Sequence, residues 1–458
     1  MYLLYSLVLS LLFIALLPYF AYQALRRGKY SGSFKERMGF LPALLHGDAR
    51  ETVWVHTVSV GEFLAARSLI GLLRRELPGA RIVVSTTTLT GQQLARSQSH
   101  LFDDLLYFPF DWKFSVRRAL STVSPRVVIL LETELWPNFL RECRKRSVST
   151  VLANGRISPR SFRRYQLVGA PFRRAIEDFS LMVMQSEADA DRARRLGAPV
   201  DRVRVCGNLK YDQSETRQES RDIAKPSDEI DRLFGLSLSP YLIVAGSTAQ
   251  GEEEMLLATL AEIRKSAGLE DARLVLAPRR PERFDEVARL IRRSGFVFAR
   301  RSESGQSPLK IQSPIKSIGK VDAASSTKTP DVILLDTIGE LASIYRFAAV
   351  VFVGGSLVPR GGHNVIEPAA FAKPIVVGPH TENFRQIVSD FLQAGALVQI
   401  NHAGKDGIAE LARELTRLLL DRESARATGE RARDLLFRNR GATGCTVAMI
   451  RELVTIQK

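Results

Sequence analysis

Short apolar runs alternate with longer amphipathic stretches along most of this 458-residue chain, and that alternation limits the folds it can adopt. The runs have the length of buried strands, whereas the stretches between them are long enough for helices. Such an alternation predicts an α/β protein built from doubly wound parallel sheets. The expected strands are Val53–His56, Ile82–Ser85, Leu105–Phe108, Val127–Leu131, Thr150–Ala153, Leu181–Met184, Val203–Cys206, Tyr241–Ala245, Leu274–Ala277, Val332–Leu335, Val350–Val353 and Ile375–Val377.

A polar stretch beginning at Ser214 interrupts this pattern, and residues 214–238 are expected to form a linker. The chain then divides into an N-terminal Rossmann-like domain over residues 26–213 and a C-terminal one over 239–458, whose last helix could return to the first domain. Because ligands of doubly wound sheets bind beyond the carboxyl ends of the strands, we expect the active site in a cleft between the domains. Residues 302–330 are rich in Ser, Thr and Lys and predict a flexible insertion.

Residues 1–25 carry no charged side chain, and roughly 20 apolar residues suffice to cross a bilayer. Arg26, Arg27 and Lys29 follow the apolar segment, which reverses the order found in a secretory signal peptide. The sequence therefore predicts a membrane anchor, a transmembrane helix with the body of the protein in the cytoplasm. Pro18 could kink the segment, so a shallow insertion on one side of the membrane stays open.

The chain has a formal net charge of +16, which calls for an anionic neighbour such as nucleic acid, an acidic membrane surface or an acidic glycolipid. Its three cysteines are far apart in sequence, so neither a disulfide framework nor a cysteine-based zinc site is expected. The six histidines show no metal-ligand spacing. A reducing compartment and a site without metal fit this composition.

A glycine-rich segment follows the apolar run that ends at Val353. Gly354 and Gly355 predict a tight turn, and a second glycine pair precedes Asn364 and a helix expected from Val365 to Ala372. Glycines allow a backbone to approach a ligand closely, and a helix start presents N–H groups to an anion. The segment predicts a phosphate site, with Glu367 on the same helix face as Asn364 for ribose hydroxyls. A glycine-rich turn with an N-capping Asn explains the same residues equally well.

Acidic side chains follow two of the expected strands in the first half. Ser59 and Glu62 have the spacing of a capping box, although Gly61 between them costs about 1 kcal/mol relative to alanine in a helix. That cost favours a turn that a ligand must approach. Glu132 and Glu134 stand where a strand gives way to a helix, and read by themselves they are solvated surface carboxylates.

The remaining polar features have plain structural explanations beside their functional ones. Arg156, Arg160 and Arg163 begin a basic stretch that could bind glycolipid phosphates or membrane headgroups, or simply be solvated. Ser247 begins a plausible helix cap. The Asp189-Ala190-Asp191 triplet has the D-x-D pattern of metal-dependent glycosyltransferases, but it lies in a helical segment and predicts a solvated helix surface.

Several of these segments together resemble one family, the 3-deoxy-D-manno-octulosonic acid (Kdo) transferases that modify lipid A in Gram-negative bacteria. The resemblance runs in consistent order from Glu36 to Phe384. The segments that carry it are V-S-V-G-E at 58–62, L-E-T-E-L-W-P at 131–137, G-N-L-K-Y-D at 207–212, P-R-R-P-E-R-F at 278–284, D-T-I-G-E-L at 336–341 and the glycine-rich segment at 352–379.

This resemblance implies a GT-B glycosyltransferase with two Rossmann-like domains facing a cleft. It assigns Glu62 as the general base, and it assigns Glu132 and Lys210 to stabilising the transition state. The N-terminal domain would receive the lipid A precursor at the cytoplasmic face of the inner membrane, through the arginines named above. The C-terminal domain would bind CMP-Kdo, with no metal or cofactor. The residues implied in CMP binding are Pro278, Arg279, Ile338, Gly339, Glu340, Asn364, Val365, Ile366, Glu367 and, more loosely, Ser247.

Two alternatives remain on the sequence alone. One is another GT-B enzyme, a heptosyltransferase or a nucleotide-sugar epimerase, which preference for a uridine or adenosine nucleotide over cytidine would reveal. The other is a membrane-tethered nucleic-acid-binding protein, which only the net charge suggests, because no recognisable nucleic-acid module is present.

Overall fold

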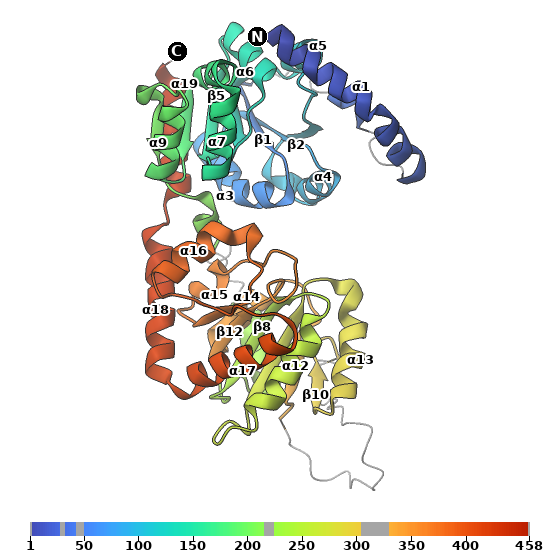
Figure 1. Ribbon diagram of the computed structural model, residues 1–458, viewed down its shortest axis with the longest axis vertical. Helices are drawn as coiled ribbons and strands as arrows, with labels where there is room; N and C mark the ends of the chain where they lie inside the picture. The colour runs from blue at the N-terminus through green and yellow to red at the C-terminus, as the bar shows by residue number, and fades with distance from the viewer. Residues whose placement is uncertain (1, 28–32, 43–49, 215–223, 304–328, 457–458) are drawn as a thin grey trace. The chain divides into compact units, whose positions relative to one another are not determined.

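The computed structural model describes residues 2–27, 33–42, 50–214, 224–303 and 329–456. The chain forms two compact units (Figure 1). Unit 1 contains Met1–Thr216 together with Asn439–Lys458, and unit 2 contains Arg217–Arg438. Most of the insertion expected at 302–330 lies outside the described residues.

Within the described residues, unit 1 contains a seven-stranded parallel sheet in the order β3-β2-β1-β4-β5-β6-β7. Each of its predicted strands is present. The strands are β1 (Thr52–Thr57), β2 (Arg81–Thr86), β3 (Asp104–Tyr107), β4 (Pro125–Leu131), β5 (Ser149–Gly155), β6 (Leu181–Met184) and β7 (Val203–Val205). The helices are α1 (Tyr2–Arg27), α2 (Phe34–Arg37), α3 (Val60–Glu76), α4 (Leu89–Arg96), α5 (Lys113–Val123), α6 (Pro137–Lys145), α7 (Pro159–Val168), α8 (Ala170–Glu177), α9 (Glu187–Arg195) and α19 (Ala442–Ile456).

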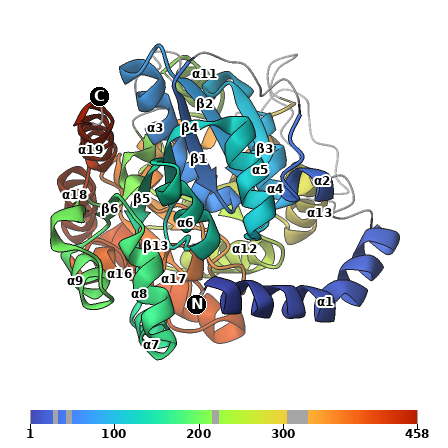
Figure 2. The same cartoon turned by 90° about the horizontal axis from the view of Figure 1, so that it is seen from above.

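Both faces of this sheet are buried, as a doubly wound fold requires. Successive side chains of a strand point to opposite faces, so Val53 and Val55 of β1 join one core and Trp54 joins the other. Helices α3, α4 and α19 contribute to the first core, and α5, α6, α8 and α9 contribute to the second; the elements can be followed in Figure 2. The sequence alternation is therefore explained by burial on both sides.

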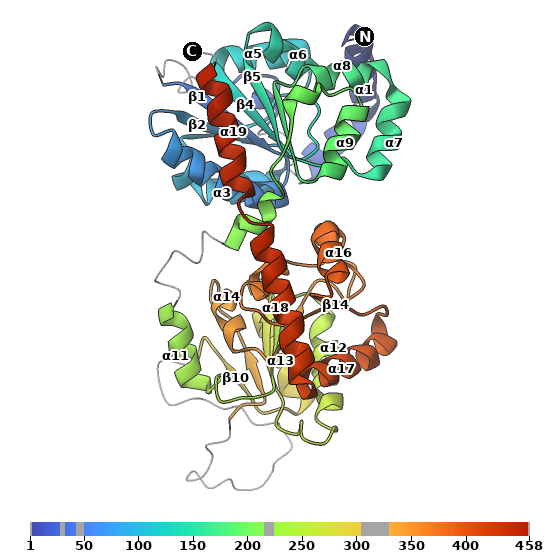
Figure 3. The ribbon, with the colours of Figure 1, turned by 90° about the vertical axis from the view of Figure 1, so that its left-hand side faces the viewer.

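The last helix, α19, belongs to unit 1, where it packs on α3 (Figure 3). Asp212 helps to hold its start, because its carboxylate accepts hydrogen bonds from the N–H groups of Gly441 (2.9 Å) and Thr443 (2.6 Å). Cys206, which follows β7, forms a disulfide with Cys445 of α19. The wide spacing of the cysteines indicated no disulfide framework, but it did not reveal this single bond, because the fold brings together residues that are distant in sequence.

One face of α1 contacts the rest of unit 1. The Tyr2 hydroxyl donates to Asp178 (2.7 Å), the Asn138 amide donates to Ser6 Oγ (3.0 Å), and the Phe13 ring packs edge-on against Trp112. No helix in the described part of the chain combines the length and the apolar character needed to cross a membrane. The transmembrane helix expected over residues 1–25 is therefore not found.

The described part of unit 2 contains a second seven-stranded parallel sheet, in the order β10-β11-β9-β8-β12-β13-β14. The strands are β8 (Leu242–Thr248), β9 (Arg273–Pro278), β10 (Phe298–Arg300), β11 (Val332–Leu334), β12 (Val350–Val353), β13 (Ile375–Val377) and β14 (Val398–Gln399). The helices are α11 (Ala224–Phe234), α12 (Glu252–Ile263), α13 (Phe284–Ser294), α14 (Leu341–Ile344), α15 (Ile366–Ala369), α16 (Arg385–Gln393), α17 (Gly404–Leu420) and α18 (Arg422–Arg438). Helix α11 lies inside the stretch expected to be a linker, and the two outer strands, β10 and β14, were not predicted.

Candidate active site

Glu62 lies in the first turn of α3, directly after the inner strand β1. Its carboxylate accepts a hydrogen bond from the Val58 N–H (2.6 Å) and contacts the Ser59 hydroxyl (3.4 Å), while Ser59 Oγ accepts from the Glu62 N–H (3.5 Å). Ser59 therefore caps α3, but the Glu62 carboxylate accepts from the Val58 N–H, one residue before the cap, and does not close the box on the Ser59 N–H. Burial raises the pKa of Glu62 to about 8; the Val58 hydrogen bond opposes this rise, and the negative charges of Glu132 and Glu134 add to it. A carboxyl group with this pKa can exchange a proton near neutral pH.

Glu132 and Lys210 form an ion pair at the same edge of the sheet. The distance from Lys210 Nζ to Glu132 Oε1 is 3.1 Å, and both side chains are about four-fifths buried, with exposures of 21% for Glu132 and 17% for Lys210. Glu132 follows β4 with a φ of +57°, a left-handed conformation that is uncommon for residues other than glycine. Strained residues of this kind cluster at functional sites. The structure thus brings together an acid and a lysine from distant parts of the sequence.

The pKa of Glu134, a residue for which the sequence predicted no separate role, is also shifted. Burial raises its pKa to about 7, with the neighbouring Trp136 side chain acting against the rise and the charge of Glu132 adding to it. Glu62, Glu132 and Glu134 thus influence one another electrostatically.

Buried polar atoms surround this edge, and sequence reasoning missed them. His56 Nε2, Thr57 Oγ1, Thr87 Oγ1 and Asn154 Nδ2 have no hydrogen-bond partner within the described residues. Their residues lie at or next to the carboxyl ends of β1, β2 and β5. The His56 ring stacks on Phe108 with ring centroids 3.7 Å apart, and burial lowers its pKa to about 3, so the imidazole is neutral. Their position at the ends of predicted strands could have identified these residues from the sequence.

Arg156 lies at this edge, whereas Arg160 and Arg163 lie on the exposed surface of α7. The Arg156 carbonyl accepts a hydrogen bond from Thr133 Oγ1 (2.7 Å), which ties it to the loop that holds Glu132 and Glu134. The Asp189 carboxylate supports the residue after Arg156, because it accepts from the Ile157 N–H (2.9 Å). Asp189 is buried, with 8% exposed, so the prediction of a solvated surface is wrong for it.

The residues implied in sugar-donor binding follow four neighbouring strands of unit 2. Ser247 lies at the end of β8, Pro278 and Arg279 at the end of β9, residues 338–340 follow β11, and residues 364–367 follow β12. These strands are adjacent in the order β11-β9-β8-β12 and run parallel, so the residues lie along one edge of the sheet. The structure therefore brings the predicted group together within unit 2.

The side chains of this group differ in what they offer a ligand. Ile338 is 82% exposed, whereas Val365 and Ile366 are fully buried, so the latter two present only backbone atoms. Asn364 Oδ1 accepts from the Ile366 N–H (3.0 Å) in a local turn, while the N-cap position of α15 is taken by Val365, one residue later than the N-capping Asn that the sequence left open. Glu340 pairs with Arg301 at 3.0 Å.

Gly354 and Gly355 lie in the turn directly after β12, whereas the phosphate site expected at the second glycine pair, before Asn364, stays a prediction. The Gly355 N–H donates to the buried carboxylate of Glu252 (2.7 Å), so the turn is filled by the protein itself. In place of the helix expected from Val365 to Ala372, the structure has only the single turn of α15. A helix this short has little dipole to attract an anion. The glycines instead allow close packing, because a Cβ on Gly354 would lie 2.6 Å from the Ser247 carbonyl oxygen.

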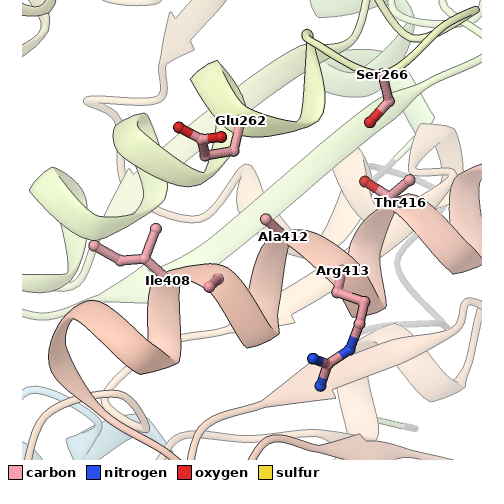
Figure 4. Close-up of a pocket in the computed structure, with 7 residues that line it drawn as sticks. Glu262, Ser266, Ile408, Ala412, Arg413 and Thr416 are labelled. Carbon is pink, nitrogen blue, oxygen red and sulfur yellow. The ribbon is translucent and has the colours of Figure 1, made fainter.

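A cavity of about 570 Å³ lies between α12 and α17 (Figure 4). Its lining includes Glu262, Ile408 and Arg413. Glu262 is ten residues beyond Glu252 along α12, roughly 15 Å at 1.5 Å per residue, so this cavity lies away from the carboxyl edge of the sheet. No group of three or more metal-binding side chains occurs among the residues that the structure describes.

Two parallel α/β units with ligand-type residues at their carboxyl edges define a GT-B-like enzyme. The sequence model described as "3-Deoxy-D-manno-octulosonic-acid transferase (kdotransferase)" matches residues 32–213. A 3-deoxy-D-manno-octulosonic acid transferase of Haemophilus influenzae is 32% identical over 441 residues, 95% of this chain and 93% of the relative. One of Bordetella pertussis is 31% identical over 389 residues, 82% of each chain.

The chain belongs to the Kdo transferase family and is a glycosyltransferase. A solved UDP-GlcNAc 2-epimerase of Neisseria meningitidis is also similar, with 12% identity, a TM-score of 0.55 and coverage of 88% of this chain and 100% of that one. At this identity the likeness is one of fold alone.

Proposed function

We propose that this protein transfers Kdo from CMP-Kdo to the tetraacyl-disaccharide precursor of lipid A (lipid IVA), a step in lipopolysaccharide core synthesis. The observation that carries the proposal is the Glu132–Lys210 ion pair within electrostatic reach of Glu62, whose pKa is raised, in a chain of this family. These are the groups that a sugar transfer without a metal requires: a base and a fixed positive charge.

In the proposed reaction, the Glu62 carboxylate removes the proton from an acceptor sugar hydroxyl. The hydroxyl oxygen forms a bond to the donor carbon of Kdo while the bond from that carbon to the phosphate oxygen breaks. CMP leaves with the bonding electrons, and the donor carbon is inverted. Lys210, oriented by Glu132, stabilises the negative charge that develops. No divalent metal takes part in this scheme.

The carboxyl edge of unit 2 would bind CMP-Kdo. Ile338 and the neighbouring Gly339 are exposed enough to contact a cytosine ring, and Arg279 supplies a positive charge beside the β9 end. Asn364 and Glu367, whose side chains lie 3.5 Å apart, are suited to hydroxyl groups of the nucleotide. Ser247 has a φ of +55°, a conformation held by the loop around it.

We further propose that α1 attaches the enzyme to the cytoplasmic face of the inner membrane, where its lipid acceptor lies. Leu7, Leu11 and Ile14 are 57%, 58% and 64% exposed and share one face of α1, away from the face that contacts unit 1. Apolar helix faces of this kind insert at the membrane surface. The exposed Arg160 and Arg163 are suited to the phosphates of the acceptor.

Mass spectrometry of the products tests the transfer. Purified protein with CMP-Kdo and the tetraacylated precursor should give a product heavier by one or more Kdo residues, and EDTA should leave the yield unchanged. Protection against thermal unfolding should be greater with CMP than with UDP or AMP. Stabilisation by UDP and no transfer from CMP-Kdo would instead favour a heptosyltransferase or an epimerase.

A further inference from the structure

Glu252, the first residue of α12, is fully buried, yet no substrate role falls on it. Four backbone N–H groups converge on its carboxylate. Oε2 accepts from Ala249 (2.7 Å) and Gly355 (2.7 Å), and Oε1 accepts from Ser356 (2.9 Å) and Leu357 (2.8 Å). Every described hydrogen-bond partner of the carboxylate is a donor, which is the environment of an ionised group. Burial raises the pKa of Glu252, and these four donors act in the opposite direction.

Three of these donors are consecutive and belong to the turn after β12, more than one hundred residues away. Consecutive N–H groups that converge in this way form an anion-binding concavity. In many nucleotide-binding proteins such a turn holds a phosphate. Here a carboxylate of the protein fills it, in addition to accepting from the Ala249 N–H in the loop before α12.

The turn that Glu252 holds supports the segment from Arg360 to Asn364. The Gly362 N–H donates to the Gly355 carbonyl (2.8 Å), and a Cβ on Gly355 would lie 2.8 Å from the His363 ring. On its other side the turn packs on the β8 loop, because a Cβ on Gly354 would lie 2.6 Å from the Thr248 Cα. One carboxylate thus joins the β8 loop to the segment that carries Asn364.

We propose that Glu252 is a positioning residue of the sugar-donor site, which fixes the β8 loop and the Arg360–Asn364 segment in the arrangement that binds the nucleotide. The inference rests on the proposed function, because it takes the edge of unit 2 as the CMP site. Glu252 does not touch the nucleotide. It acts through the turn at Gly355–Leu357, whose N–H groups are occupied before any ligand arrives.

The first test measures CMP binding by calorimetry. Glu252→Gln keeps the size of the side chain but turns an NH₂ group toward N–H donors, so the dissociation constant for CMP should rise about tenfold or more. The Michaelis constant for the sugar donor should rise with it, whereas that for the acceptor should not change. Glu252→Asp keeps the charge with a shorter reach and should give an intermediate loss.

The matched control is Glu254→Gln, which removes the same charge from an exposed position in the same helical turn. It should bind CMP as the wild type does. Equal weakening by Glu252→Gln and by Glu254→Gln, or unchanged CMP binding in a folded Glu252→Gln protein, would overturn the inference.

The second test uses wild-type protein and does not depend on the folding of a variant. Amide hydrogen exchange at Gly355, Ser356 and Leu357 should be slow without CMP and should change little when CMP is added. Protection that develops only on addition of CMP would mean that the turn is a phosphate site, and the inference fails. If the wild type binds no CMP, the proposed function fails, while the exchange in the unliganded protein still tests the role of Glu252.

Discussion

The carboxyl edges of the two seven-stranded parallel sheets treat their charged groups in opposite ways. In unit 1, Glu62 and Glu134 are partly buried with raised pKa values, and His56 Nε2 and Asn154 Nδ2 have no hydrogen-bond partner within the described residues. In unit 2, the acids are neutralised internally. Glu252 accepts four N–H groups, Glu253 forms a two-pronged ion pair with Arg283 (2.8 and 3.2 Å), and Asp336 pairs with Arg300 (2.7 Å).

The two edges thus differ in how completely their polar groups are paired, and this difference suits one to reaction and the other to binding. At an edge suited to reaction, polar groups lack some of their hydrogen-bond partners, so they can exchange protons with a substrate. A binding edge satisfies its own groups, so that its loops are already ordered when the ligand arrives. We therefore expect substitutions in unit 1 to change turnover and substitutions in unit 2 to change affinity.

The largest expected effect comes from Glu62→Gln. Turnover should fall roughly 100-fold or more, because the general base is lost. The affinity for CMP should remain that of the wild type, since Gln can still accept from the Val58 N–H and the Ser59 cap of α3 is unchanged. Steady-state kinetics and calorimetry check this. A joint collapse of CMP binding and melting temperature would show that Glu62 only caps α3.

Removal of the positive charge at Lys210 should have the next largest effect. Lys210→Met leaves the Glu132 carboxylate without its ion-pair partner and should lower turnover by about tenfold to a hundredfold. Lys210→Arg keeps the charge and should retain more activity. If the Met and Arg variants were equally active, the positive charge of Lys210 would have no part in the reaction.

The pH dependence should report the pKa of Glu62. Since the base must be ionised, kcat/KM should rise with pH and level off above about 8. Glu134→Gln removes a negative charge that raises this pKa, so the rise should move to lower pH. Glu187→Gln, an exposed acid on α9, is the control and should leave the profile in place. A shift to higher pH in Glu134→Gln would contradict the arrangement.

The same pKa has a consequence for stability. The folded pKa of about 8 lies above the ordinary value of 4.5, so the folded state binds the Glu62 proton more tightly. The contribution of Glu62 to the free energy of unfolding is fully present below pH 4.5 and is lost as the pH rises through about 8. The melting temperature of Glu62→Gln should consequently fall less than that of the wild type over this range.

The smallest effect on binding should follow reduction of the Cys206–Cys445 disulfide. Loss of a disulfide commonly costs about 2–4 kcal/mol of stability, and this one lies wholly in unit 1. Unfolding of unit 1 should shift to lower temperature, whereas CMP affinity should not change. The Cys206→Ser variant checks the assignment, because added reductant should have no further effect on it.

The sequence predicted the central strands well because burial on both faces produces continuous apolar runs. It missed β10 and β14 because strands of three and two residues at sheet edges leave no such run. In the site, Glu62 had a local signal, but the pairing of Glu132 with Lys210 came only from the family resemblance. The occupation of the glycine turn by Glu252 depends on a contact between distant residues, which no local pattern contains.

The place of α19 determines how this protein can be divided. Its Val447 and Ile450 side chains are part of the core of unit 1, although they follow the whole of unit 2 in the chain. A fragment that ends at the polar stretch after Ser214 would leave that core open to water. Expression of unit 1 by itself therefore requires the last helix to be supplied again, by fusion or as a separate peptide, whereas residues 217–438 can be taken as one piece.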